Sequence, residues 1–434
     1  MKNPRFSILR NLAVPGTFLL ILLLCGSVFA EPLTLNDALK MAMENNPVIK
    51  STKSEYFSLK SARQVVEAEN SLSASVTDFL GKRNMQMINY SAPGVMPSTV
   101  SMLPDNNWNS ANFTLMMPLY TGGLINSQVK SAFYKEKAGE KNITAIENEV
   151  AFLVKVKYFE LLFKTEEIKI YSRLVNLEKE QLRISEDLFK QGKISLLYNL
   201  RAKNELARAQ QELNNKTAEK EIVFSELKKV LGKSQEYDLS ISDSLAAITF
   251  DMPLSECVKA ALNERPDLKT VENNLKSANE EIKRAGSLYS PQVYLMGMYD
   301  YKNNIDHGYS LSAVASLPIF DSGSRKFKLE EAKNNQEKVL SLKKDAELNI
   351  EQEIVKVTQE LKAARENVVL SEAAVAEAEE VYKIAKLKYE ERKGIYIEIL
   401  DALLNLTSAH TRRFEAIYKN NIAVAELYLK MGRK

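Results

Sequence analysis

Side chains that commonly carry chemistry are few in this chain, and they form no recognisable active site. The two histidines, His307 and His410, fall in a predicted loop and a predicted helix. Neither has a cysteine or paired acids at metal-ligand spacing. The sequence contains no nucleophile elbow, phosphate-binding loop or dinucleotide-binding glycine motif. We therefore expect no catalytic residue, no metal site and no cofactor.

Glu398 and Asp401 form a carboxylate pair that follows a predicted helix corner. Acids at i and i+3 share one helix face. Crowded carboxylates attract and hold cations, as charged rings do in channels. The simpler interpretation is a solvated helix face, since acids and bases cover most of the predicted long helices. The choice depends on the elements that position these residues.

The first thirty residues predict a secretory signal peptide. Three basic residues precede the apolar run FLLILLLC at 18–25, and VFA at 28–30 provides a cleavage site after Ala30. An uncleaved anchor helix is the alternative, but Pro15 and Gly16 interrupt the stretch before it reaches about 20 apolar residues. The expected mature chain therefore begins at residue 31.

Charge and cysteine content exclude two classes of interaction. Without the three basic residues of the signal peptide, 56 basic side chains balance 56 acidic ones. Because the net charge is zero, we expect no nucleic-acid partner. Only Cys257 remains, so no intramolecular disulfide can form. Beyond the signal no apolar run is long enough for a membrane helix, so any membrane segment must consist of strands.

The chain contains one internal repeat. Three pairs of segments correspond: 33–50 with 252–269, 116–123 with 315–323, and 189–202 with 389–402. The offset is 219 residues for the first pair and 200 for the other two. A loop explains the difference, since SAPGVMPSTVSMLPDNN at 91–107 faces only NNIDHG in the second repeat. Length changes concentrate at exposed loop tips, so each repeat carries a hairpin with its tip in solvent.

Alternating residues predict the strands of these hairpins. In YSLSAVASLPI at 309–319, apolar side chains and Tyr309 fall on one face and serines on the other, with Val314 as the exception. Strands of about ten residues suit a tilted membrane strand, although ordinary soluble hairpins fit the composition equally well. The predicted strands cover about 75–90, 108–120, 291–301 and 309–320.

Long helices follow the hairpins. The segments 122–190 and 322–390 each run 69 residues without proline, which corresponds to roughly 100 Å of helix. Apolar or small residues recur at 4,3 spacing from Ile350 to Tyr389, which predicts a coiled-coil seam. In the first repeat we assign a similar seam to Phe152, Val156, Phe159, Phe163, Ile170, Leu174, Leu177, Ile184 and Leu188.

Tight corners at 190–195 and 390–395 end the long helices, and return helices follow at 196–231 and 396–431. The expected organisation is a first repeat over 31–232, a linker over 233–252 and a second repeat over 253–434. The fold class is mainly α with a membrane β part. Four strands cannot close a barrel, so several chains must pool their strands if these lie in lipid. The expected product is an oligomeric α/β-barrel tube.

The twofold repeat, PLYTGG and PIFDSG at the strand-to-helix turns, and YIEILDA after the second corner resemble the TolC-like outer-membrane efflux proteins. The resemblance covers essentially all of 33–431. It implies a trimer with a 12-stranded barrel in outer-membrane lipid and a long periplasmic helical extension. It also implies a periplasmic adaptor and an inner-membrane transporter as partners. The turn residues are Pro118, Gly122, Gly123, Pro318, Asp321 and Gly323.

The same resemblance assigns roles at the corners. It implies that Gly192, Lys193, Lys393 and Gly394 lie at the tip where the adaptor docks, and that Glu398 and Asp401 form a periplasmic acidic gate. The chain departs from the family pattern at Arg392, which replaces the usual glycine, and at Tyr198, where an acid can occur.

The implied function is a passive outer-membrane conduit of a tripartite efflux or export system. A secreted coiled-coil scaffold or adhesin is the main alternative, although it would not require two ten-residue hairpins between helices. An adaptor protein would lack strands of membrane length.

Overall fold

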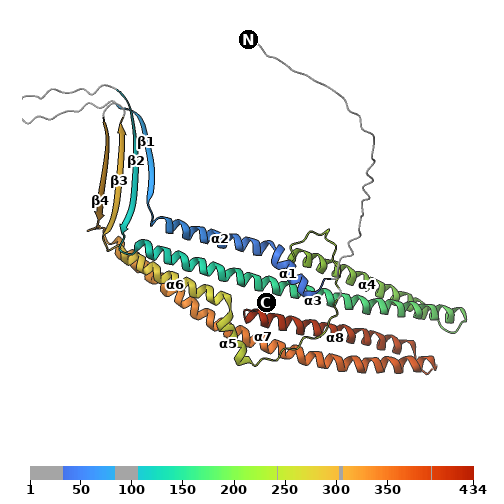
Figure 1. Ribbon diagram of the computed structural model, residues 1–434. Helices are drawn as coiled ribbons and strands as arrows, with labels where there is room; N and C mark the ends of the chain where they lie inside the picture. Colours follow the sequence, from blue (N-terminus) through green and yellow to red (C-terminus); the bar gives the residue numbers. More distant parts are fainter. Residues whose placement is uncertain (1–32, 84–105, 242, 303–305, 392) are drawn as a thin grey trace, which may run out of the picture.

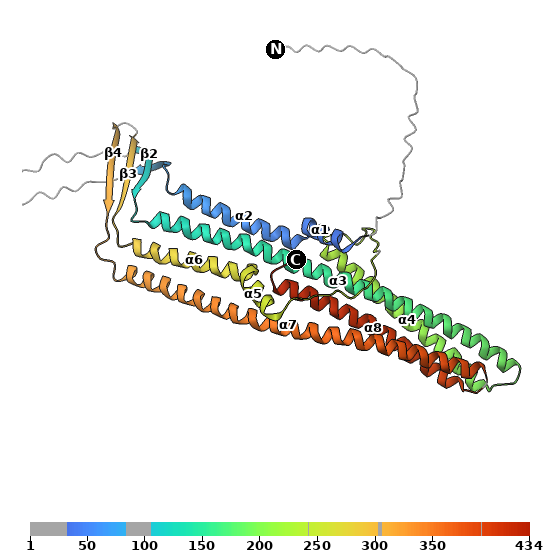
Figure 2. The same ribbon diagram turned by 60° about the horizontal axis from the view of Figure 1, so that its bottom comes forward.

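The computed structural model describes residues 33–83, 106–241, 243–302, 306–391 and 393–434. A long bundle of helices carries a four-stranded sheet at one end and the helix corners at the other (Figures 1 and 2). In this part of the chain, no helix combines the length and apolar character that a membrane span requires. The predicted signal peptide and residues 91–105 of the predicted loop lie outside the described residues.

Two copies of one structural unit make up the described chain. The first contains α1 Leu35–Asn45, α2 Pro47–Ala68, β1 Ser73–Arg83, β2 Asn106–Tyr120, α3 Leu124–Lys190 and α4 Leu196–Val230. The second contains α5 Leu254–Glu264, α6 Pro266–Ser287, β3 Gln292–Lys302, β4 Asp306–Ser316, α7 Ser324–Glu390 and α8 Tyr396–Lys430. Corresponding helices have equal lengths of 11, 22, 67 and 35 residues. The mainly helical fold with two hairpin-bearing repeats is thus confirmed.

The strands form one antiparallel sheet in the order β1-β2-β3-β4. The strand predicted over 309–320 is wrong at both ends, because β4 spans Asp306–Ser316. Its partner β3 begins at Gln292, opposite Ser316, so the residues after Ser316 have no pairing partner in β3. The strand predicted over 75–90 begins at Ser73, and its residues beyond Arg83 lie outside the described part.

Apolar seams hold the long helices together. In α7, Ile350, Ile354, Val357 and Leu361 are at most 3% exposed, as the 4,3 spacing predicts. The middle of α3 is buried on more than one side, because α1, α4 and α8 all contribute to its core. Nearer the corner one assigned seam residue is wrong, since Leu177 is 38% exposed, whereas Leu174 is buried and Ile184 and Leu188 are half-buried. Buried residues there include Glu178 and Ser185, which correspond to Ala378 and Ala385 of the α7 seam.

The expected linker over 233–252 lies against α8 and is held by side-chain amides. Asn421 donates from Nδ2 to the carbonyl oxygen of Ala246 at 2.8 Å, and its Oδ1 accepts from the Ile248 amide at 2.8 Å. Asn420 donates to the carbonyl oxygen of Ile248 at 2.9 Å. Both asparagines are at most 2% exposed. Buried amides therefore satisfy backbone groups of a segment whose described residues form no helix or strand beyond one bridge from Ile241 to Leu33.

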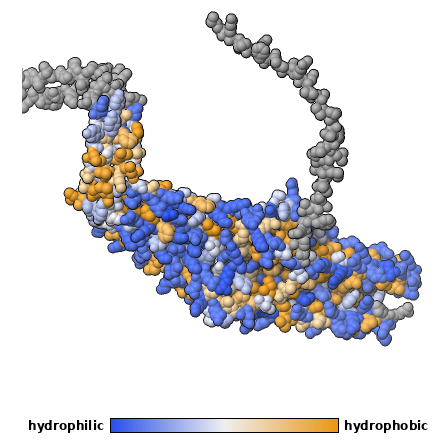
Figure 3. Space-filling model, in the orientation of Figure 1, coloured by the Kyte–Doolittle hydropathy of each residue, from blue (hydrophilic) through white to orange (hydrophobic). Residues whose placement is uncertain are grey.

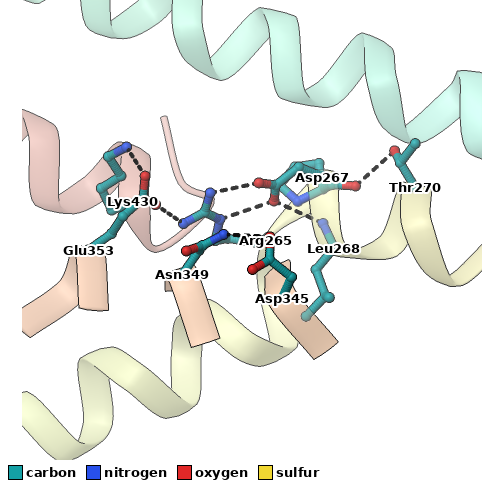
Figure 4. Close-up of polar contacts among 9 residues, drawn as sticks. Arg265, Asp267, Leu268, Thr270, Asp345, Asn349, Glu353 and Lys430 are labelled. Carbon is teal, nitrogen blue, oxygen red and sulfur yellow. Dashed lines mark hydrogen bonds and ion pairs between the residues drawn. The ribbon is translucent and has the colours of Figure 1, made fainter. Parts of the chain in front are cut away.

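A second polar contact fixes the junction between α5 and α6. Arg265 lies between the two helices and pairs with Asp267 at 2.6 Å and with Glu353 of α7, while Lys430 of α8 reaches Glu353 at 2.7 Å (Figure 4). The charged hydrogen bonds to its two acids outweigh burial and raise the pKa of Arg265. Gly432 packs so closely here that a Cβ would lie 2.8 Å from Arg265 Cα. The carboxyl end of the chain is thereby tied to the start of α6.

We expect Asn421→Ala to destabilise the protein by roughly 2–4 kcal/mol, because it leaves a buried N–H and a buried C=O without partners. The exposed Asn405→Ala on the same helix is the control and costs about 0.5 kcal/mol or less. Thermal unfolding measures both costs, and amide hydrogen exchange reports local opening at Ile248. Equal midpoints for the two variants would contradict the assigned role.

Candidate functional site

The two faces of the sheet differ in polarity. Register places Ala111, Phe113 and Leu115 of β2 on one face with Tyr299 of β3 and Leu311 of β4. Serines and threonines of β1, β2 and β4 share the opposite face, which also carries methionines of β2 and β3. Hydrophobic side chains are visible on the sheet in Figure 3. Tyr309 and Leu311 are 90% and 75% exposed, so the apolar face lacks cover in a single chain.

The predicted strand-to-helix turns join the sheet to the helices. Pro118 lies in β2 beside a bulge, and Gly122 and Gly123 follow with φ of 61° and 89°. A Cβ at Gly122 would stand 2.2 Å from the Ser290 side chain, so this turn requires glycine.

The second turn uses a different device. Pro318 lies between β4 and α7, Ser322 takes a φ of 54°, and Gly323 takes 85°. Asp321 caps α7 by accepting from the amides of Gly323 at 3.2 Å and Arg325 at 3.0 Å. These hydrogen bonds lower the pKa of Asp321, and the bond from the Arg325 amide has the largest effect.

The two corners lie together at the far end of the bundle (Figure 2). Gly192 has a φ of 70°, and the Lys193 amide donates to the carbonyl oxygen of Leu188 at 2.9 Å, which is a left-handed helix termination. In the second corner the amides of Lys393 and Gly394 both donate to the carbonyl oxygen of Lys388. Arg392 lies outside the described residues. A Cβ at Gly192 would meet no atom within 4 Å, so this position is open to a partner.

Both corners expose apolar side chains that the sequence analysis did not assign. Leu196, Leu197 and Leu200 of α4 are 53%, 56% and 52% exposed, and Ile395 of the second corner is 61% exposed. Between the corners lies a cavity of about 150 Å³ lined by Gln181, Ser185, Ile194, Tyr198, Tyr389 and Ile395. Tyr198, one of the two departures from the family pattern, thus lines a space shared by both repeats.

Glu398 and Asp401 lie on the exposed side of the first turns of α8. Ile399, Ala402 and Leu403 of the same helix point into the bundle and are at most 3% exposed. Glu398 Oε2 lies 3.2 Å from the place where a Cβ of Gly394 would stand, so the glycine leaves room for this carboxylate. The structure therefore brings the two acids to one exposed face of α8.

A group of buried polar side chains on α3 was not predicted from the sequence. Glu178 is 2% exposed, and its Oε2 has no hydrogen-bond partner among the described residues. Burial, followed by the nearby charge of Glu205, raises the pKa of Glu178 to about 7. Gln181 also has a buried oxygen without such a partner, and Ser185 lies 3.4 Å from Asn199. Aligning the repeats at the 200-residue offset matches Glu178 to Ala378, a member of the predicted seam. That match was the signal in the sequence that Glu178 would be buried.

The loop predicted around His307 is wrong, because this residue lies in β4 opposite Tyr301 of β3 and stacks on it with ring centroids 6.3 Å apart. His410 lies in the predicted helix, α8, 3.7 Å from Glu379. Burial lowers the pKa of His410.

Comparison with known families decides the class of protein. Residues 88–233 and 257–433 match the outer membrane efflux protein family. The chain belongs to this family. It is an outer-membrane channel component of a tripartite efflux system, which also includes an adaptor and an inner-membrane transporter, and it is not an enzyme. The alternative of a scaffold or adhesin is not favoured.

Individual relatives agree with this assignment. The chain is 20% identical over 344 residues to the cobalt-zinc-cadmium resistance protein CzcC of Cupriavidus metallidurans. The aligned region covers 78% of this chain and 81% of CzcC. The CmeC outer membrane channel of Campylobacter jejuni superposes with a TM-score of 0.79 at 18% identity, covering 92% of this chain and 85% of CmeC. VceC of Vibrio cholerae gives 0.76 at 15% identity, covering 92% and 96%. These structures share the fold of the chain.

We expect Gly192→Val to loosen the first corner by roughly 1–2 kcal/mol, because a branched side chain disfavours the left-handed backbone. Gly192→Asn costs less, since asparagine tolerates this conformation. Gly286→Val is a control at a glycine with ordinary φ and no atom near the added Cβ. Hydrogen exchange at residues 189–195 measures the opening, and unchanged protection in Gly192→Val would show that backbone strain does not limit this corner.

Proposed function

We propose that three copies of this chain form one conduit from the periplasm to the cell exterior. The four strands of each copy join edge to edge in a 12-stranded barrel within outer-membrane lipid. The helices of the three copies continue as a periplasmic tube. Substrate passes without chemical change, driven by the inner-membrane transporter.

The observation that carries this proposal is a sheet with two open edges and one exposed apolar face. β1 and β4 each pair on only one side, so their outer backbone groups lack partners within the described sheet. In lipid such groups must be paired, and strands from other copies are the simplest source. The apolar face with Tyr309 and Leu311 suits contact with lipid, and the serine-bearing face suits a water-filled lumen.

The corners are the proposed docking surface for the adaptor. Gly192, Lys193, Lys393 and Gly394 lie there with the exposed apolar residues Leu196, Leu197 and Ile395. An exposed apolar cluster rimmed by charges is typical of a protein-binding surface. Gly192→Asn adds a side chain to this surface while its backbone tolerates the change, so a loss of export with normal corner exchange would locate docking here.

Glu398 and Asp401 are the proposed gate. Threefold repetition would place six carboxylates at one level of the tube, and such a ring attracts cations. Their exposure in the single chain leaves them free to face a shared axis.

Assembly is the first test. We expect protein extracted in mild detergent to have the mass of three mature chains, because one chain provides four strands and small closed barrels need about eight. Native mass spectrometry measures this stoichiometry, and single-channel recording shows whether the species conducts. A stable monomer that never conducts would refute the conduit.

The gate is tested by Glu398→Gln combined with Asp401→Asn. We expect block by periplasmic divalent cations to weaken about tenfold or more, because six charges leave the constriction. Glu377→Gln with Glu380→Gln is the matched control, an exposed i,i+3 acid pair on α7. Planar-bilayer recording measures block in both. If the gate variant and its control are blocked as strongly as the parent, Glu398 and Asp401 are solvated helix charges only.

A further inference from the structure

The buried carboxyl of Glu178 stands where the second repeat has no polar group. At an offset of 200 residues, Glu178 corresponds to Ala378, Ser185 to Ala385 and Asn199 to Ile399. In the second repeat Ala385 and Ile399 pack with Ala402 in an apolar cluster. Ala378 borders a cavity that Asn405 and Ser408 of α8 also line. The same helix pairing is therefore built in the second repeat without a carboxyl at this position, so the fold does not require Glu178.

The surroundings of Glu178 leave its charge uncompensated. On the same face of α3, Leu174 and Val175 pack one turn away in an apolar cluster with Ala209 of α4 and Leu403 of α8. Tyr382 of α7 packs against that cluster. On α4 the acid Glu205, which lies 3.5 Å from Arg208, adds a repulsive charge to Glu178.

Packing is also looser on this side of the bundle. Gln181, one turn beyond Glu178, lines the 150 Å³ cavity between the corners and a larger one that also borders Tyr382 and Lys386 of α7. By contrast, the middle of α3 packs in the main apolar core, where Val154 and Tyr158 are at most 1% exposed. An ionised carboxylate in an apolar contact is costly. The second hairpin reaches this region through Leu403, which packs with Leu174 and Val175 one turn from Glu178, so separation of the hairpins at this cluster would admit water to the carboxyl.

We propose that protonation of Glu178 controls how tightly the tip of the α3–α4 hairpin packs against the α7–α8 hairpin. The protonated carboxyl keeps the hairpins packed. The ionised carboxyl favours a separated arrangement in which water reaches it. If the proposed conduit is correct, this joint makes opening of the periplasmic end depend on pH.

The direction follows from proton linkage. A solvated glutamate has a pKa of about 4.5, and in the packed arrangement the pKa of Glu178 is about 7. The packed arrangement binds the proton of Glu178 more tightly than the separated one. Protonation therefore stabilises the packed arrangement fully below about pH 4.5, and this stabilisation is lost progressively as pH rises to about 7. The packed-to-separated ratio changes on the order of a hundredfold at most across this window.

Distances between spin labels on α4 and α8 test the proposal without any transport assay. Labels at the exposed positions Asn204→Cys and Asn405→Cys, in a Cys257→Ala background and diluted with unlabelled chains, report hairpin separation. We expect the separated population to rise at least fivefold from pH 5 to pH 8.5. Glu178→Gln is expected to stay packed at both pH values, and Glu178→Ala, which copies the second repeat, to lose the pH response.

Glu180→Gln is the matched control, because Glu180 is exposed and its pKa is lowered by Arg183. It is expected to keep the full pH response. A wild-type protein whose distances do not change with pH, or a Glu178→Gln variant that responds like the parent, would overturn the proposal. These distances are measured on extracted protein whether or not it conducts, so the proposed conduit could fail while this joint stands, or the reverse.

Discussion

The long helices depend on an unbroken seam, because a helix of 67 residues that runs outside any globular core is stable only where one side is buried. Ile350, Ile354 and Val357 illustrate the seam where it is complete. Each long helix then needs a return helix of matching phase, and each corner needs a backbone that reverses direction within a few residues. Gly192 and its left-handed conformation are a consequence of that need.

Duplication gives the molecule two nearly equal halves, and the differences between them mark the places where function can reside. The helices of the two repeats have the same lengths, so architecture is conserved within the chain. The polar residues of the seam are not conserved between the repeats, because Glu178 and Asn199 stand where the second repeat has an alanine and an isoleucine. The turns differ as well, with Gly122 in the first and a capping Asp321 in the second. A buried group that its own duplicate omits is better explained by switching than by stability.

At the other end, the sheet shows what a single chain cannot complete. Its edges are open and its apolar face is exposed, while the opposite face carries serines and threonines. These features fit a family whose members are outer-membrane efflux channels. Two turns of positive φ lead from the sheet into the long helices, so the sheet and the helical end are joined without a long linker.

The sequence by itself determined the repeat, the lengths of the long helices and the alternation of the strands, because periodicity and chain breakers act over short distances. It also indicated the family through PLYTGG and YIEILDA. Only the tertiary structure decided the end of β4, since that depends on where β3 begins, and the path of the linker, which rests on Asn420 and Asn421 of α8. It also decided which residues of α3 are buried near the first corner. Apolar Leu177 suggested one phase, but packing against other helices buries Glu178 instead, and no local pattern carries that information.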